Sequence, residues 1–220
     1  MSAVSFKQRV LSSIIKHAKD FQSTFVEYEY LLHSSKFTVQ PYYIISTMES
    51  NYKHLTGVVS ELSPYEFFSK CIAETIVESD IDFVFEKPNG TFEDVKDTVR
   101  KKIKALPYIE NIFCVGLIGE ENFIKGKVSC AIATSDNKIT LGFEERIFSR
   151  PKTLLRGNEI KNPVNIDFIL RRKKGEKHFD TIMQGDISSV FTKQFELRKS
   201  WKHIKHIVIE TINILELNED

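Results

Sequence analysis

The chain has 220 residues, of which 41% are hydrophobic and 11% aromatic, a composition that indicates a folded protein and excludes a disordered one. Its formal net charge of +1 excludes a strong overall field that would attract nucleic acid or a membrane surface. The three cysteines lie singly in apolar runs, so we expect reduced thiols and a cytoplasmic protein. No signal-peptide pattern and no bilayer-length apolar run is evident, so we expect no membrane partner.

The first part of the chain predicts helices around one strand. Residues 5–33 predict a long amphipathic helix, because apolar residues recur there at three- and four-residue spacing. Residues 36–47 are β-branched and aromatic and predict a strand, and residues 51–58, NYKHLTGV, predict a loop. The segment SPYE at residues 63–66 predicts the start of a helix, with a serine cap, a proline in the first position and a glutamate that completes a capping box.

The middle and later parts of the chain predict more strands than helices. Residues 81–86 predict a short strand, and residues 91–107 a helix that begins at a threonine and stops at a proline. From about residue 112 the pattern changes to short strands separated by glycine, asparagine or charged residues. The clearest hairpin lies at residues 164–183, where apolar residues alternate before a turn at residues 173–176.

This order, helices followed by an antiparallel meander, predicts an α+β fold. The tail from about residue 188 predicts a C-terminal helix, although its isoleucine and valine content leaves a strand open. We therefore expect a helical extension over residues 1–33, a central domain over residues 34–187 and a helical tail over residues 188–220.

Positive charge is concentrated in one stretch of this nearly neutral chain. Ten lysines or arginines lie between residues 146 and 177, against three acidic residues. Neutralisation of phosphate is a common use of such a stretch. The part at residues 171–177 is more typical of a solvated hairpin tip. The segment RPKTLLR at residues 150–156 combines two arginines, a lysine and a threonine, and is the better candidate for phosphate contacts.

The residue types favour metal-free acid–base chemistry. The sequence contains no glycine-rich phosphate loop, no hydrolase or metalloprotease motif and no acidic cluster suited to Mg²⁺. Cleavage of RNA through its own 2′-hydroxyl needs a base, an acid and cations, which histidine, lysine and arginine supply. His54 is the best candidate, with Thr56 and the backbone near Gly57 beside it. The alternative is that His54 closes a loop, Thr56 caps a turn and Gly57 supplies a positive φ.

The stretch NYKHLTGV resembles the Asn-x-x-His-Leu-Thr-Gly signature of a phage-associated nuclease family, which is grouped with barnase, EndoU, certain colicins and RelE. The lead-in YEYLL and KFTV, the following PYEFF and the later RPKTLLRG extend the resemblance to about residues 26–185. It implies N-terminal helices, an antiparallel sheet, and endonucleolytic cleavage of RNA that leaves a 2′,3′-cyclic phosphate. By position, it assigns His54 and Thr56 to the signature and Thr153 to a later Ser/Thr position.

We therefore expect a metal-independent endoribonuclease without a cofactor, acting as a toxin or phage-conflict effector, with RNA and a cognate inhibitor or antitoxin as partners. The expected catalytic residues supply proton transfer or charge: His54, Thr56, Arg150, Thr153, Arg156 and His178. The expected RNA-binding residues are all cationic: Lys125, Lys127, Lys152, Arg171, Arg172, Lys173 and Lys174. The alternatives are a catalytically inactive RNA- or protein-binding module of the same fold, and a scaffold assembled through its terminal helices.

Overall fold

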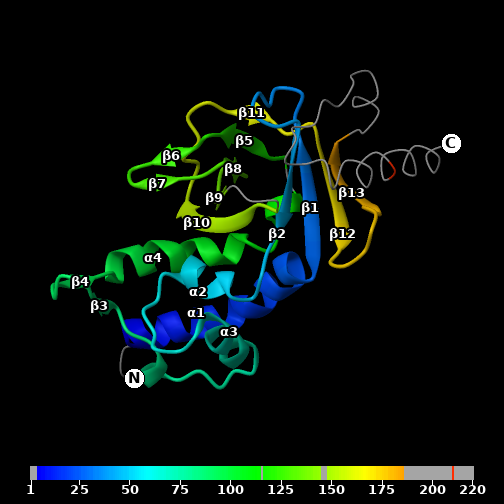
Figure 1. Ribbon diagram of the computed structural model, residues 1–220. Helices are drawn as coiled ribbons and strands as arrows, with labels where there is room; N and C mark the ends of the chain where they lie inside the picture. The colour runs from blue at the N-terminus through cyan, green and yellow to red at the C-terminus, as the bar shows by residue number, and fades with distance from the viewer. Residues whose placement is uncertain (1–3, 115, 145–147, 186–209, 211–220) are drawn as a thin grey trace.

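Two antiparallel sheets lie against a layer of helices, as Figure 1 shows for the computed structural model. The structure describes residues 4–114, 116–144 and 148–185, together with Glu210. Helical segments come first and most strands follow, so the predicted α+β class is confirmed. The predicted C-terminal helix and the predicted boundary after residue 187 lie outside the described residues, apart from Glu210.

The first helix is shorter than predicted. Helix α1 spans Phe6–Phe21 and is capped by Ser5, whose hydroxyl accepts from the Gln8 N–H at 3.0 Å. A π-helical turn follows at Gln22–Val26, and the chain then enters strand β1, Tyr28–His33. The prediction of one helix over residues 5–33 is therefore wrong beyond the π-helical turn. Nearly every residue of β1 is buried, and a strand that is buried on both faces lacks the alternation that distinguishes it from a helix.

Strand β1 is an interior strand of a four-stranded sheet with the order β13-β12-β1-β2. The predicted hairpin is confirmed, because β12 and β13 pair antiparallel after a turn at residues 174–175. The strand predicted over residues 36–47 is shorter in the structure, where strand β2 spans only Tyr42–Ser46. The backbone of residues 38–40 instead donates to the carboxylate of Glu121. The strands are β2 Tyr42–Ser46, β12 Phe168–Lys173 and β13 Thr181–Gly185.

A five-stranded sheet with the order β10-β9-β8-β5-β11 forms the other half of the fold. The predicted meander begins later than residue 112, because Ile112–Cys114 forms a 3-10 turn. A small hairpin of β6 Ile124–Lys125 and β7 Val128–Ser129 extends from this sheet. The five strands are β5 Ile118–Glu121, β8 Ile132–Ser135, β9 Ile139–Glu144, β10 Arg150–Arg156 and β11 Val164–Asn165.

The two sheets are joined beside β10. Ser149 donates its N–H to the Ile44 carbonyl at 2.7 Å and accepts from the Ser46 N–H at 3.1 Å, which forms a parallel bridge to β2. Strand β10 is otherwise the edge of its sheet, and helices α2 and α4 pack along it. This places the RPKTLLR segment, which is strand β10, directly beside the NYKHLTGV segment.

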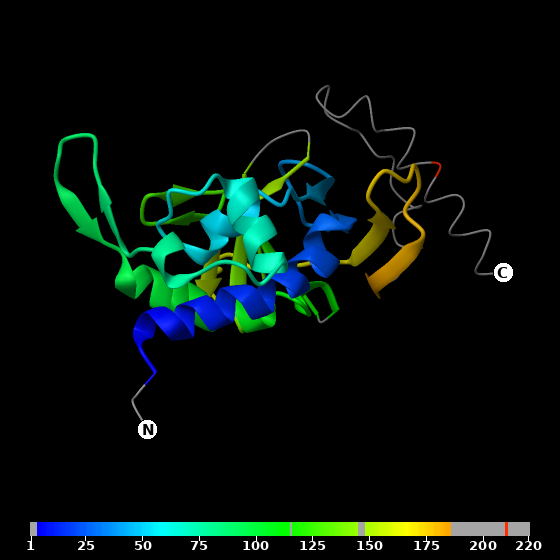
Figure 2. The same cartoon turned by 90° about the horizontal axis from the view of Figure 1, so that it is seen from below.

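The helical layer contains three further α-helices. Ser63 caps α3 as predicted, with its hydroxyl accepting from the Glu66 N–H at 3.2 Å. The helix predicted over residues 91–107 begins later, because Phe92–Asp94 forms strand β4 and pairs with strand β3, Val84–Glu86. Figure 2 shows this β3–β4 hairpin projecting from the body of the protein. The helices are α2 Asn51–Thr56, α3 Pro64–Ile72 and α4 Lys96–Ala105.

One hydrophobic cluster extends from the helices into both sheets. Helix α1 contributes fully buried side chains such as Ile14 and Phe21, and Tyr52 of α2 packs on Phe21 with ring centroids 5.1 Å apart. Burial of this apolar surface is the main source of stability for the fold. Among the described residues, none of the helices combines the length and the apolar character needed to cross a bilayer.

Candidate active site

The stretch NYKHLTGV is a short helix and not the predicted loop. Asn51 closes the preceding turn, because its Oδ1 accepts from the Met48 N–H at 2.9 Å. Tyr52 and Leu55 are fully buried and anchor the helix in the core. Gly57 ends it in the left-handed conformation, with φ 71°, as glycine favours at helix C-termini. A helix of six residues contains less than two turns, which is too short to produce a recognisable apolar period.

Thr56 forms hydrogen bonds with the backbone at the C-terminal end of this helix. Its hydroxyl donates to the Lys53 carbonyl at 2.7 Å and accepts from the Val58 N–H at 3.2 Å. The residue is fully buried. The hydroxyl therefore has no exposed surface, and this position is at odds with the predicted contact between Thr56 and a phosphate.

His54 lies on the face of α2 that meets strand β10. Its Nε2 is 2.6 Å from the carbonyl oxygen of Lys152. The pairing of β10 with β9 shifts register between Pro151 and Thr153, so the ladder skips Lys152, as expected at a β-bulge. Because a carbonyl only accepts, Nε2 carries the hydrogen, and Nδ1 of the neutral ring holds the free lone pair. The contact therefore leaves Nδ1 as the atom that can take up a proton.

The surroundings of His54 favour its neutral form. Burial lowers the pKa of His54, and the nearby amine of Lys102 lowers it further. The bond to the Lys152 carbonyl and the carboxylate of Glu144 oppose these effects without reversing them. The ring is crowded by neighbouring atoms, yet the residue keeps exposed surface that a substrate can reach. A neutral, accessible imidazole is suited to act as a general base near pH 7.

Lys102 of α4 joins this site although the sequence did not single it out. Its Nζ donates to the backbone carbonyl of His54 at 2.9 Å. Its stem passes over Gly57, where an added Cβ would lie 2.8 Å from Lys102 Cδ. Burial lowers the pKa of Lys102 to about 8. The sequence pattern that could have pointed to Lys102 is its spacing. It lies three residues after the buried Val99 and four before the buried Leu106, on the apolar face of α4.

The other predicted residues of the β10 segment are spread along the strand. Lys152 donates from Nζ to the Ser129 carbonyl at 2.8 Å, which ties β10 to the β6–β7 hairpin. Arg150 pairs in register with Glu144 at the start of the strand. Thr153 is buried against Gly142 on the interior side. Arg156 lies four residues beyond Lys152, or about 13 Å along an extended strand, so the structure does not bring it to His54.

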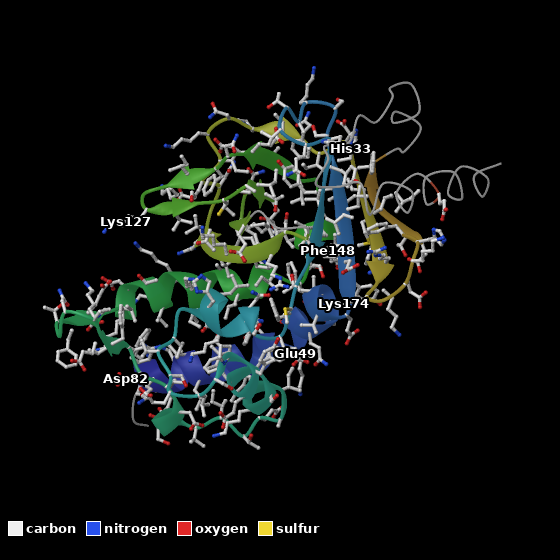
Figure 3. The ribbon with its side chains drawn as sticks, viewed as in Figure 1. His33, Glu49, Asp82, Lys127, Phe148 and Lys174 are labelled. Carbon is white, nitrogen blue, oxygen red and sulfur yellow. The ribbon has the colours of Figure 1, made fainter. Side chains whose placement is uncertain are left out.

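The β6–β7 hairpin carries two of the predicted RNA-binding lysines. Lys127 is exposed at the tip of the hairpin (Figure 3). Lys125 is also exposed and forms an ion pair with Glu159. Lys152 is bonded to Ser129 of this hairpin, so the hairpin that carries Lys125 and Lys127 adjoins strand β10.

His178, predicted as the second proton-transfer group, lies in another part of the fold. It belongs to the loop between β12 and β13, where its Nε2 is 3.9 Å from Oε2 of Glu210. Strands β1 and β2 lie between this loop and helix α2 in Figure 1. The structure therefore does not bring His178 to His54, because the turn after β12 keeps it on the four-stranded sheet.

The basic hairpin of β12 and β13 uses much of its charge within the fold. Arg172 is buried and donates from Nε to Glu29 at 2.7 Å and from Nη1 to the Lys177 carbonyl at 2.8 Å. Arg171 stacks over the ring of Tyr28, with its Cζ 4.4 Å from the ring centroid. Lys174 donates to the Thr47 carbonyl. The prediction that Arg172 contacts RNA is therefore corrected, since its guanidinium joins two strands.

The described residues contain no group of three or more His, Cys, Asp and Glu side chains that could hold a metal ion. Beside the imidazole of His54 the site holds the amines of Lys102 and Lys152 and the carboxylate of Glu144. Burial raises the pKa of the neighbouring Cys130 to about 11, so its thiol is not a ready nucleophile.

The fold is of the α+β class, with N-terminal helices and antiparallel sheets, and its candidate site places an imidazole beside two lysines. Residues 13–188 match the family described as phage-Barnase-EndoU-ColicinE5/D-RelE like nuclease4, and the chain belongs to that family. The predicted resemblance is thereby confirmed at the level of the family. No curated protein and no solved structure matches the chain.

Proposed function

We propose that the protein is a metal-independent endoribonuclease that cleaves RNA to a 2′,3′-cyclic phosphate. The observation that carries this proposal is the geometry of His54, whose Nε2 is held by the Lys152 carbonyl while Nδ1 keeps its lone pair. Membership of a nuclease family supports the reaction class. The lowered pKa of His54 keeps the ring in the form that accepts a proton.

In this mechanism Nδ1 of His54 takes the proton of a ribose 2′-hydroxyl. The resulting oxygen attacks the adjacent phosphorus, and the bond to the 5′-oxygen breaks. Cations stabilise the charge that develops on the phosphorus oxygens. Lys152 lies at the bulge beside His54, with Arg150 two residues away. Lys125 and Lys127 on the β6–β7 hairpin would hold the RNA backbone near this site.

The proposal includes a biological role as a toxin or phage-conflict effector in the cytoplasm. A ribonuclease of this kind requires control, so a cognate inhibitor protein is the expected partner. The support for this role is the family to which the chain belongs.

The test of the function is cleavage of a short RNA by the purified chain in excess EDTA. We expect cleavage to persist and mass spectrometry to find a 2′,3′-cyclic phosphate. The matched control is the same RNA with a single 2′-deoxynucleotide at the cleavage position, which lacks the attacking oxygen and should stay intact. Cleavage of this control, or activity that is lost in EDTA and restored by Mg²⁺, would contradict the proposal.

The second candidate is a catalytically inactive module that binds a protein. The observation that favours it is the projecting β3–β4 hairpin, on which Phe92 is 71% exposed. An exposed aromatic side chain on an extended hairpin is typical of a protein-binding surface. This candidate predicts that His54→Ala leaves partner binding unchanged and that Phe92→Ser weakens it.

A further inference from the structure

Cleavage of RNA through its 2′-hydroxyl needs a second group that gives a proton to the leaving 5′-oxygen. The sequence suggested His178 for this role, but that residue lies in the β12–β13 loop. Among the described residues, Lys102 is the titratable side chain bonded to the backbone of His54 itself, with 2.9 Å between its Nζ and the His54 carbonyl oxygen.

We propose that Lys102 is the second proton-transfer group of this site and protonates the 5′-oxygen as it leaves. This inference rests on the proposed ribonuclease function. The stem of Lys102 is held between α4 and the glycine that ends α2, so the amine has a defined position. One of its three hydrogens bonds the His54 carbonyl, and two remain for a substrate.

The chemistry of the Lys102 environment suits this role. Among the described residues no carboxylate forms an ion pair with Lys102, and burial is what shifts its pKa. Burial lowers the pKa of Lys102 to about 8, so the amine is mostly protonated near pH 7 yet gives up its proton more readily than an ordinary lysine. The charged or titratable groups that face the His54–Lys102 pair are Lys152 of β10 and Glu144 of β9.

The step balances without any further reactant. Nδ1 of His54 accepts the proton of the 2′-hydroxyl while the bond between O2′ and phosphorus forms. The bond between phosphorus and O5′ breaks, and Nζ of Lys102 transfers its proton to O5′. The products are a 2′,3′-cyclic phosphate and a free 5′-hydroxyl, with His54 protonated and Lys102 neutral. Exchange of one proton with water restores both residues.

The experiment compares two substrates, an RNA with the natural 5′-oxygen and one with sulfur at that bridging position. A thiolate leaves without protonation, so the sulfur substrate does not need the acid. We expect Lys102→Met to lower cleavage of the oxygen substrate by about two to four orders of magnitude and to leave cleavage of the sulfur substrate near that of the unaltered chain. His54→Ala should lower cleavage of both substrates, and His178→Ala should affect neither.

A second variant, Lys102→Arg, keeps a donor for the His54 carbonyl but replaces the amine by a group that does not release its proton. It should show the same selective loss. The unaltered chain should lose activity above about pH 8, where Lys102 loses its proton, and this loss should be absent from Lys102→Arg. An equal loss on both substrates in both variants would make Lys102 a positioning residue and overturn the inference, as would full activity on the oxygen substrate. An unaltered chain that cleaves neither substrate would instead overturn the ribonuclease proposal, and this inference with it.

Discussion

At the scale of the residue, four residues of the stretch NYKHLTGV have different roles. Asn51 closes the turn before α2, and Thr56 satisfies the backbone at its end. Gly57 supplies the left-handed conformation and leaves room for the stem of Lys102. These three residues build a short, rigid helix that presents His54 to the bulge of β10. The stretch therefore connects strand β2 to helix α3 and also holds His54 in place at the candidate site.

The substitution His54→Ala should lower RNA cleavage by about two to four orders of magnitude, the usual contribution of general acid–base catalysis. It should lower the free energy of unfolding by only about 1 kcal/mol, because the ring is partly exposed and makes one hydrogen bond to a carbonyl. Cleavage assays and urea melts of the same preparation measure the two effects. A variant that is several kcal/mol less stable, yet fully active per folded molecule, would show that His54 is structural.

The lowered pKa of His54 also predicts how stability depends on pH. Below about pH 6.5 the unfolded chain protonates this imidazole, whereas the folded chain does not until the pH falls through the lower folded pKa. The unfolded state therefore binds more protons, and the contribution of His54 to stability is lost as the pH falls. Urea midpoints of the unaltered chain and of His54→Ala should therefore approach each other as the pH falls from about 7 to 5, because only the unaltered chain loses this contribution. An NMR titration of His54 with a midpoint above the ordinary value would contradict this prediction.

The substitution Gly57→Ala should destabilise the fold by about 1 kcal/mol or more, because its φ of 71° disfavours a side chain and the new Cβ would lie 2.8 Å from Lys102 Cδ. Gly90→Ala is the matched control, since Gly90 has a φ of 75° and nothing within 4 Å of its added Cβ. Urea melts should show the larger loss for Gly57→Ala. Equal losses would mean that contact with Lys102 adds no strain beyond that of the backbone.

At the scale of the element, β1 owes its place in the sheet to a buried ion pair as well as to its apolar residues. Glu29 of β1 and Arg172 of β12 face each other in register, and their side chains are 8% and 7% exposed. Arg172 also lies over the ring of Phe179, with its Cζ 4.6 Å from the centroid. The guanidinium therefore joins β1, β12 and the loop before β13.

Removal of one partner should be costly, because it leaves the other charge buried without compensation. We expect Glu29→Ala to lower the free energy of unfolding by about 3–5 kcal/mol, and the double substitution Glu29→Met with Arg172→Met to recover most of that loss. The control is Glu74→Ala, which removes an exposed ion pair with Lys19 and should leave the urea midpoint nearly unchanged. A double variant no more stable than Glu29→Ala would show that the pair itself is required.

At the scale of the whole molecule, the lysines and arginines predicted to bind RNA fall into two groups on different sides of a nearly neutral protein. Figure 3 shows Lys127 at the tip of the β6–β7 hairpin and Lys174 well apart from it, at the end of β12. The first group adjoins the candidate site through the bond from Lys152 to Ser129. A substrate held at His54 should therefore follow the β6–β7 hairpin.

This arrangement predicts different effects for two exposed lysines. Lys127→Gln should weaken RNA binding and reduce the slope of log affinity against log salt by about one, as expected for the loss of one phosphate contact. Lys173→Gln, its counterpart on the β12–β13 hairpin, should leave the slope unchanged. Fluorescence titrations with an uncleavable 2′-deoxy oligonucleotide at several salt concentrations measure both slopes. An equal reduction for Lys173→Gln would show that the β12–β13 hairpin also binds the backbone.

Local signals determined several features of this protein from the sequence alone. Ser63 and the proline after it mark the start of α3 because capping depends on neighbouring residues only. The alternation of residues 164–183 marks the β12–β13 hairpin because strand and turn lie next to each other in the chain. The order of helices and strands indicates the α+β class, and the family predicted from the sequence is the one whose model matches residues 13–188. His54 is proposed as a site residue on the same kind of local signal, a polar residue in a recognisable stretch.

Tertiary structure decided the features that depend on residues far apart in the chain. Residues 28–33 are a strand because β2 and β12 pair on either side of them, and no local pattern distinguishes that double burial from a helix. Arg172 is structural because Glu29 lies opposite it. The position of Lys102 on the apolar face of α4 does not show its partner, because the carbonyl of His54 that it binds lies 48 residues earlier in the chain. The pKa of a side chain depends on the groups that surround it in space, and the folded chain alone brings those groups together.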